Sequence, residues 1–148
     1  DDSEASAGWY WQFNRKQGYK HDGTTRTPNS NWITYINENS DWLPANDPCA
    51  ILLGSGWRLP TGTEWETTDN TGGWDNYNKT FGSGLKLHAA GGLGYNSGAL
   101  RSRGSYGYYW SSLQSGSGYG RCLSFSSGFS DMFSDGKAVG RSVRCLRD

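Results

Sequence analysis

The sequence predicts a small α+β domain with two short helices, small antiparallel sheets and long loops. The 148 residues include 22 glycines, eight tryptophans and nine tyrosines, while only 19% are charged. This composition suits a loop-rich domain with an aromatic core and does not suit a helical bundle. Several segments alternate apolar and polar residues as strands do, and one carries the capping signature of a helix. This length predicts a single domain over 8–148, after a polar leader over 1–7 that we expect to be disordered.

The first part of the chain predicts a strand, a loop and a helix. The aromatic run over 8–13 has strand character, whereas 15–27 is polar and contains glycine. A short helix is expected over 30–39, where Ile33 and Ile36 lie three positions apart.

A second helix is predicted over 62–68 by a capping box. Thr61 precedes Glu64 by three positions, so its hydroxyl can accept from the Glu64 amide while the Glu64 carboxylate accepts from the Thr61 amide. Trp65 is expected to be buried on this helix.

Four later segments alternate at the period of a strand. They are 85–90, 108–112, 121–125 and 142–146, and a glycine-rich loop over 67–84 precedes the first of them. Alternation predicts that Leu123 and Phe125 face the core. Cys122 and Ser124 should then point the other way.

Charge and hydropathy argue against two classes of partner. Fourteen basic residues balance fourteen acidic ones without a basic cluster, which argues against nucleic-acid binding. Arg26 and the pair Arg101 and Arg103 are expected to be solvated rather than to clamp phosphate. No run of apolar residues is long enough to cross a bilayer, so we expect no membrane insertion.

The titratable residues do not assemble into a recognisable catalytic set. His21 and His88 are the only histidines, and His88 lies in an alternating segment where a structural role is the commoner one. Glu64 is already used by the predicted capping box. No Ser/His/Asp set and no convergent set of oxygen ligands is evident. We therefore expect no enzyme activity, no catalytic residues, no metal and no cofactor.

The cysteines number three, namely Cys49, Cys122 and Cys145. An odd number leaves at least one thiol unpaired in a monomer. No Cys-x-x-Cys occurs, so a zinc knuckle or a redox motif is not expected. The residues alone leave open which cysteines pair, and three reduced thiols are an alternative.

Five short blocks of the chain match a known pattern in their order and spacing. They are Asp47-Pro48-Cys49, Trp57-Arg58-Leu59-Pro60-Thr61, Glu64-Trp65, Tyr109-Trp110-Ser111-Ser112 and Val143-Arg144-Cys145. Together they resemble the C-type-lectin-like superfamily, in the branch shared by formylglycine-generating enzymes and the Fibrobacter-type major paralogous domain. The resemblance implies that fold, with Trp57, Leu59 and Trp65 largely buried. It also implies a Cys49–Cys145 disulfide, which leaves Cys122 free.

The resemblance implies recognition rather than chemistry. Formylglycine-generating enzymes carry two reactive cysteines close together near the C-terminus, whereas Cys122 and Cys145 are far apart here. The calcium-dependent lectin motifs Glu-Pro-Asn, Gln-Pro-Asp and Trp-Asn-Asp do not occur, and Trp74-Asp75-Asn76 is only a rearranged version of the last. An enzyme relative that has lost or moved its residues, and a structural module of a larger surface protein, are the alternatives.

The last third of the chain has an unusual composition. Asparagine occurs ten times over 1–96 and never over 97–148, where there are thirteen serines and nine glycines. Diversity-generating retroelements mutate adenines and so convert asparagine codons into Ser, Gly, Tyr, Phe, Asp or Arg codons, among others. Over 113–135 only Gln114 and Met132 are beyond the reach of such changes. The stretch thus resembles a diversified version of an asparagine-rich template, and plain drift toward Ser/Gly loops is the alternative.

Candidate ligand-binding residues lie in the loops expected over 95–135. Aromatic and charged side chains in a Ser/Gly background are typical of adaptable binding surfaces. The candidates are Tyr95, Tyr106, Tyr108, Tyr119, Arg121, Phe129, Asp131, Phe133 and Asp135. Tyr119 and Arg121 are expected to reach the same open surface as 129–135, although one of the two phenylalanines could instead fill the core.

These residues predict a non-catalytic recognition domain. The partner is expected to be a protein or glycan on a cell surface, bound by the tip of an adhesin, a receptor-recognition protein or a phage tail fibre. The expected location is extracellular, on a bacterial cell surface or a phage virion, and an oligomer is compatible with the sequence.

Overall fold

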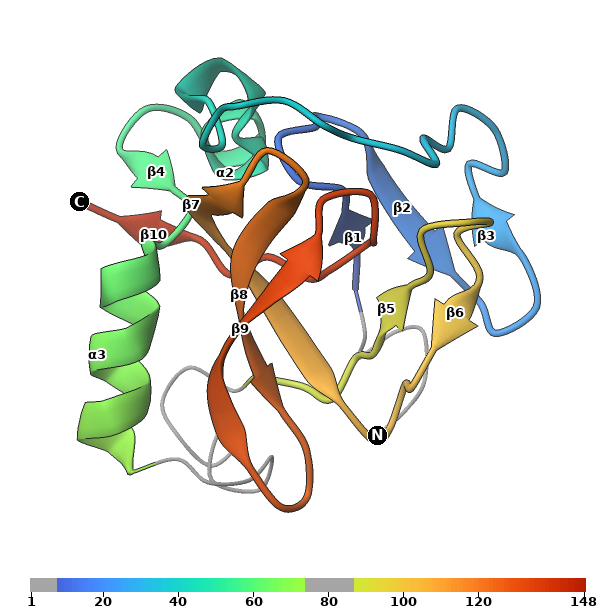
Figure 1. Cartoon of the computed structure of the whole chain (residues 1–148). Helices are drawn as coiled ribbons and strands as arrows, with labels where there is room; N and C mark the ends of the chain where they lie inside the picture. Colours follow the sequence, from blue (N-terminus) through green and yellow to red (C-terminus); the bar gives the residue numbers. More distant parts are fainter. Residues whose placement is uncertain (1–7, 74–86) are drawn as a thin grey trace.

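The computed structural model describes residues 8–73 and 87–148 and confirms the α+β class. Within these ranges, two α-helices and one short 3-10 helix accompany four small antiparallel sheets (Figure 1). In chain order the elements are β1 (Tyr10–Trp11), β2 (Gly18–His21), β3 (Arg26–Thr27), η1 (Pro44–Asn46), α2 (Pro48–Leu53), β4 (Trp57–Arg58), α3 (Gly62–Gly72), β5 (Gly92–Leu93), β6 (Leu100–Arg101), β7 (Gly107–Gly116), β8 (Tyr119–Phe125), β9 (Ser130–Gly136) and β10 (Leu146–Arg147). The leader expected over 1–7 lies outside the described residues.

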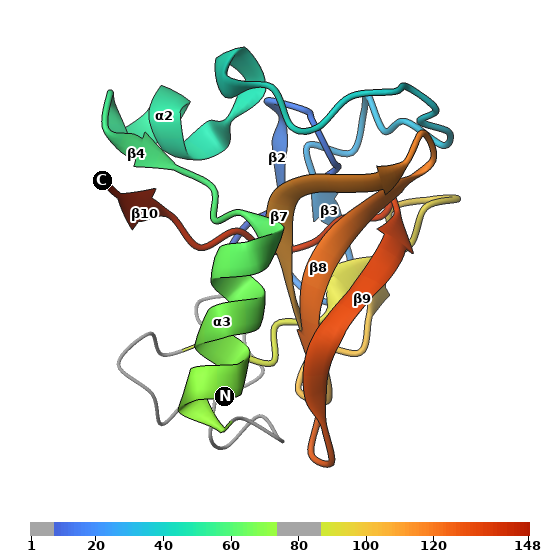
Figure 2. The same cartoon turned by 60° about the vertical axis from the view of Figure 1, so that its left-hand side comes forward.

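The sheet β7–β8–β9 has helix α3 on one of its faces (Figure 2). Leu123 of the middle strand pairs with Tyr109 on one side and with Met132 on the other. All three are buried and share a core with Trp65 of α3. Trp65 also donates its indole N–H to the Trp110 carbonyl, at 3.1 Å. The strands predicted over 108–112 and 121–125 are confirmed as parts of β7 and β8.

The opposite face of the same sheet covers a second core, built by the N-terminal segment. Trp110 and Cys122 are cross-strand partners there, and both are fully buried. The ring of Phe13 meets the rings of Trp110 and Trp42 edge-on, at 5.3 and 5.2 Å between centroids. Cys122 and Ser124 do point to the opposite face from Leu123 and Phe125, as alternation predicts. Both are nevertheless buried, because this second face of β8 is also covered.

The segment 140–142 connects three of the sheets. Its isolated bridges to β5, β1 and β7 are Leu93↔Gly140, Trp11↔Arg141 and Tyr109↔Ser142. Arg141 and Trp11 exchange two backbone hydrogen bonds, at 2.8 and 3.0 Å. The backbone of Arg141 is thus fixed between sheets. The strand predicted over 142–146 is reduced to the bridge at Ser142 and the later strand β10.

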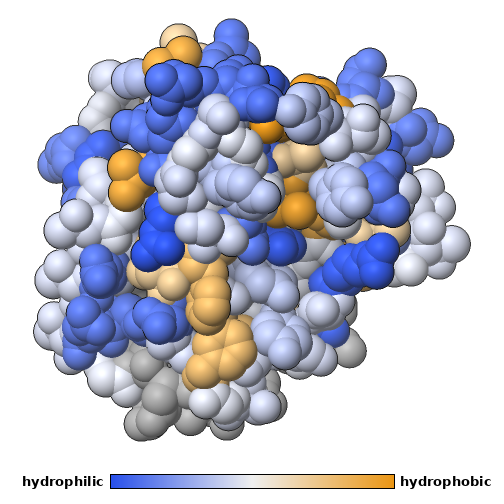
Figure 3. All heavy atoms as spheres, viewed as in Figure 1, coloured by the Kyte–Doolittle hydropathy of each residue, from blue (hydrophilic) through white to orange (hydrophobic). Residues whose placement is uncertain are grey.

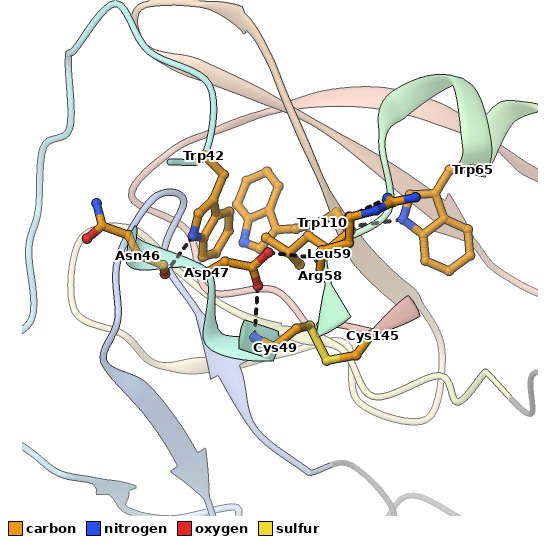
Figure 4. The surroundings of a disulfide bond; sticks show 9 residues. All are labelled: Trp42, Asn46, Asp47, Cys49, Arg58, Leu59, Trp65, Trp110 and Cys145. Carbon is orange, nitrogen blue, oxygen red and sulfur yellow. Dashed lines mark hydrogen bonds between the residues drawn. A yellow bond between two sulfur atoms is a disulfide. The ribbon is translucent and has the colours of Figure 1, made fainter. Parts of the chain in front are cut away.

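The predicted Cys49–Cys145 disulfide is confirmed, and Cys122 is free (Figure 4). The bond joins α2 to the residue before β10 across 96 positions of sequence. Asp47 holds the same corner together, because its carboxylate accepts from the backbone N–H groups of Cys49 at 2.8 Å and Leu59 at 2.9 Å. One side chain thereby caps α2 and anchors the chain after β4.

The predicted capping box at the start of α3 is also confirmed. The Glu64 amide donates to the Thr61 hydroxyl at 3.1 Å, and the Thr61 amide donates to the Glu64 carboxylate at 2.8 Å. The helix continues to Gly72, beyond the predicted end at residue 68. Leu59 and Trp65 are buried as predicted, whereas Trp57 is only half-buried.

The helix predicted over 30–39 is wrong, because this segment is irregular and bonds to other parts of the chain. The Gln12 amide donates to the Ile33 carbonyl at 2.5 Å, and the Tyr19 hydroxyl donates to the Asn31 carbonyl at 2.9 Å. Asn31 has a φ of 63°, which interrupts a right-handed helix. Tertiary hydrogen bonds override the weak local pattern, and the first α-helix is α2.

One predicted strand is shorter than expected, and the described part of another is not a strand. Over 8–13 only β1 forms, and Asn14, with a φ of 59°, turns the chain soon afterwards. Over 85–90 the described part, 87–90, is not a strand. There the His88 amide donates to the Tyr109 hydroxyl at 3.0 Å, which is a side-chain contact and not part of a strand ladder.

Candidate functional site

The predicted site residues divide between the two faces of the β7–β8–β9 sheet. Phe133 is the cross-strand partner of Cys122, so it lies on the face away from α3. Arg121 pairs with Ser134 and alternates with Cys122, which places it on the α3 side. Tyr119 has the same parity as Arg121. The structure therefore does not bring Tyr119 and Arg121 to the surface that holds Phe133, because β8 and β9 pair in regular register.

Four aromatic rings form a continuous row on the face away from α3. From β9 to β7 the row consists of Phe133, Phe129, Tyr106 and Tyr108, with successive ring centroids 5.7, 6.1 and 5.9 Å apart. Phe133 is 45% exposed, and the other three side chains are half-buried. Figure 3 shows a pale orange apolar patch over β9, surrounded by more hydrophilic atoms. Neither phenylalanine fills the core.

An arginine extends this row at its β7 end. The guanidinium carbon of Arg141 lies 3.9 Å from the centroid of the Tyr108 ring, and Arg141 Nε donates to Asp135 Oδ2 at 2.9 Å. Burial raises the pKa of Tyr108, with Arg141 opposing the shift. The phenol therefore stays protonated and able to donate, and among the described residues it has no hydrogen-bond partner.

The free thiol of Cys122 lies under the same carboxylate. Its Sγ donates to Asp135 Oδ2 at 3.2 Å, and the side chain is fully buried. Burial first, and the Asp135 carboxylate second, raise the pKa of Cys122 well above its usual value. The thiol is therefore held neutral and shielded, which is unsuited to nucleophilic chemistry.

The β5–β6 hairpin stands beside the row and carries Tyr95, which is 59% exposed. Its tip is held from outside: Arg26 donates to the Ser97 carbonyl at 2.5 Å, and the Trp32 indole donates to the Tyr95 carbonyl at 2.8 Å. Gly98 has a φ of 69°, and a β-carbon there would collide with Arg26. The hairpin is thus fixed by tertiary contacts. The prediction that Arg26 is solvated is wrong, because its guanidinium binds the hairpin.

A pocket of about 350 Å³ separates the hairpin from the aromatic row. Its lining includes Tyr95, Asn96, Arg101, Tyr108 and Arg141. Two of these residues, Tyr95 and Tyr108, were predicted from the sequence. Asn96, Arg101 and Arg141 were missed, because no local pattern signals that the segment 140–142 bridges to β5.

A second exposed apolar surface lies on α2. Ile51, Leu52 and Leu53 are 51%, 69% and 52% exposed. A smaller hollow of about 240 Å³ between Ile51 and Trp9 adjoins them. We refer to Ile51, Leu52 and Leu53 as the α2 patch, which lies on a different element from the four rings of the aromatic row.

The groups that could support catalysis are engaged elsewhere or scattered. Over 8–73 and 87–148 no three His, Cys, Asp or Glu side chains gather as metal ligands would. His21 Nδ1 accepts from the Gly23 amide at 3.0 Å, and burial lowers the pKa of His88. Trp74-Asp75-Asn76 lies outside the described residues. In the described part, no helix has the length and apolar character needed to cross a membrane.

No protein-family model matches the chain, and neither a curated protein nor a solved structure matches it. Function is therefore inferred from the surface formed by the aromatic row and its pocket.

Proposed function

We propose that this domain is a non-catalytic ligand-binding module that recognises a protein or glycan on a cell surface. The aromatic row carries the proposal. Aromatic rings left partly exposed on a sheet face are costly in water unless a partner covers them, and aromatic anchors dominate binding surfaces. The rings Phe129 and Phe133 lie on or beside strand β9, which α3 supports from behind. A contact surface of this kind loses little conformational freedom on binding.

The surroundings of the row suit an adaptable contact. Asp131 is exposed beside the row, on the same face of β9 as Phe133. The β8–β9 turn next to Phe129 consists of small exposed residues, including Ser127 and Gly128. Small polar residues allow different partners to approach the rings closely.

We further propose that the domain belongs to the C-type-lectin-like superfamily, in the Fibrobacter-type branch. Support comes from the blocks that carry the resemblance. The Cys49–Cys145 disulfide and the pairing of β4 with β10 bring the early and late blocks together. The same disulfide is compatible with an extracellular place, on a bacterial surface or a phage virion.

The proposal includes diversification of the last third by a retroelement. Within 113–135, the two residues beyond the reach of adenine mutation are Gln114 and Met132, and both have structural roles. Met132 is buried in the core, and the side-chain oxygen Oε1 of Gln114 accepts from Lys137 Nζ and from the Ser40 amide, each at 2.9 Å. Variation is expected at exposed positions such as Phe133. Sequencing the locus tests this idea: a reverse transcriptase beside a near-copy of the last coding stretch supports it, and their absence contradicts it.

The two alternatives have less support. An enzyme of the formylglycine-generating type needs a reactive pair of thiols, but Cys145 is bonded to Cys49 and Cys122 is buried and neutral. A structural module, or an oligomer, would use the α2 patch. Light scattering of the wild type and of Leu52→Ser tests for such self-association: an oligomer that Leu52→Ser dissolves would favour it.

The binding proposal is tested with the double variant Phe129→Ala/Phe133→Ala. We expect attachment to bacterial cells, or to glycan and protein arrays, to be lost while the thermal midpoint changes less than for a core tryptophan variant. Tyr119→Ala is the matched control, because its ring is 56% exposed on the other face of the same sheet. Unchanged attachment of the double variant, or equal loss in Tyr119→Ala, would contradict a binding surface on this face.

A further inference from the structure

The pocket beside the aromatic row has two guanidinium groups laid over one strand. Gly92 and Gly94 are two positions apart, so their missing side chains leave space on the same side of the chain. A β-carbon on Gly92 would collide with Arg141 Nη1. A β-carbon on Gly94 would lie 3.3 Å from Arg101 Nε. The two glycines therefore form a floor on which both guanidiniums rest.

Only one of these two positive charges is neutralised within the described chain. Arg141 is paired with Asp135 at 2.9 Å, whereas the Arg101 side chain has neither an ion pair nor a hydrogen bond with any described residue. Arg101 is exposed at the rim of the pocket. The pocket thus presents an unpaired planar donor, which is the group best matched to a carboxylate.

The remaining lining supplies groups that a carboxylate alone does not need. Tyr95 offers a largely free ring and its hydroxyl, Asn96 offers an amide, and Tyr108 offers an unpartnered phenol. These groups donate and accept hydrogen bonds around an open ring face. The volume of about 350 Å³ also exceeds what one acidic amino-acid side chain would fill and lies in the range of small-ligand pockets.

We propose that this pocket binds a carboxylated sugar, such as a uronic acid or a sialic acid, with its carboxylate on Arg101 and its ring against Tyr95. The inference rests on the proposed function, since it names the ligand class of the same surface. The hydroxyl groups of the sugar would meet Asn96 and Tyr108. Arg141 would remain on Asp135 and shape the wall of the pocket.

The test uses the wild-type domain and NMR titration of the backbone amides. Probes are D-galacturonate, D-glucuronate and N-acetylneuraminate, with D-galactose and D-glucose as neutral partners and N-acetylglutamate as a carboxylate without a sugar ring. We expect at least one acidic sugar to shift the amides of Tyr95 and Asn96, with a dissociation constant on the order of 1–10 mM. Its neutral counterpart and N-acetylglutamate should bind at least about 10-fold more weakly.

Variants at Arg101 test whether this side chain binds the carboxylate of the sugar. Arg101→Ala should weaken binding of the acidic sugar about 10-fold or more. Arg101→Lys should retain part of the affinity, because lysine keeps the positive charge but lacks the two parallel N–H donors of the guanidinium. Arg147→Ala is the control for loss of one positive charge, on β10 and outside the pocket. Equal binding of neutral sugars, equal binding of N-acetylglutamate, unchanged affinity in Arg101→Ala, or no response to any acidic sugar would each overturn the inference.

The double variant Phe129→Ala/Phe133→Ala distinguishes the two proposals, because neither phenylalanine lines the pocket. If that variant loses attachment to cells or arrays while acidic sugars have no effect on the wild type, the proposed recognition surface is supported and the acidic-sugar pocket is refuted. If the double variant attaches normally and acidic sugars still bind at Arg101, the acidic-sugar pocket is supported and the role of the aromatic row is refuted.

Discussion

Reduction of the Cys49–Cys145 disulfide should cost more stability than any single contact around it. The bond closes a segment of 96 positions between α2 and β10. In the chain-entropy description, a closed loop of this length restricts the unfolded chain by about 4.7 kcal/mol at 25 °C. For a domain of this size, 1 kcal/mol moves the thermal midpoint by about 2–4 °C. Reduction should therefore lower the midpoint by about 10–20 °C.

The assay is thermal unfolding followed by circular dichroism, with and without dithiothreitol. The double variant Cys49→Ala/Cys145→Ala should match the reduced wild type in its midpoint and should not respond to dithiothreitol. Cys122→Ala is the control, because its thiol is free and its response to reduction should equal that of the wild type. A midpoint shift below about 4 °C on reduction, or loss of the response in Cys122→Ala, would refute this reasoning.

Three further outcomes are expected from the scaffold. Trp65→Ala should lower the free energy of unfolding by about 3–5 kcal/mol, since the indole is 3% exposed in the core under the sheet; a urea midpoint equal to that of the wild type would contradict this placement. Thr61→Ala should cost about 1 kcal/mol in the same urea titration, because it removes the cap of α3, while Thr61→Ser should restore most of it. The pH dependence should reflect Glu64, whose pKa is lowered from its ordinary 4.5 to about 2, chiefly by the hydrogen bonds from Arg58. Because the folded pKa is the lower one, the stabilisation is complete above pH 4.5 and is lost as the pH falls toward 2. Glu64→Gln should flatten that part of the thermal midpoint against pH, and an unchanged slope would argue against the ion pair.

The elements that the sequence predicted correctly are those whose causes lie within a few residues. The capping box needs only Thr61 and Glu64, three positions apart, and it forms as predicted. Burial of Trp65 follows from its place on the same helix. The disulfide is different, because it was inferred from a resemblance in the order of blocks rather than from Cys49 and Cys145 themselves.

The incorrect predictions concern segments whose partners are far away in sequence. Residues 30–39 carry a weak helical spacing, but the hydrogen bonds to Gln12, Tyr19 and Tyr95 that hold the neighbourhood of this segment come from distant positions. Cys122 was expected to face outward by simple alternation. It is buried because the N-terminal core covers the second face of β8, which alternation in one strand cannot show.

The sequence by itself determined the α+β class, the start of α3, and most of the aromatic candidates for recognition. Only the tertiary structure decided which of those candidates lie together. Strand register placed Arg121 and Phe133 on opposite faces of one sheet, and the bridge of 140–142 to β5 placed Arg141 beside Arg101. The physical reason is that a binding surface is assembled from side chains whose neighbours are set by strand pairing over long distances, whereas a single sequence shows only the preferences of each strand.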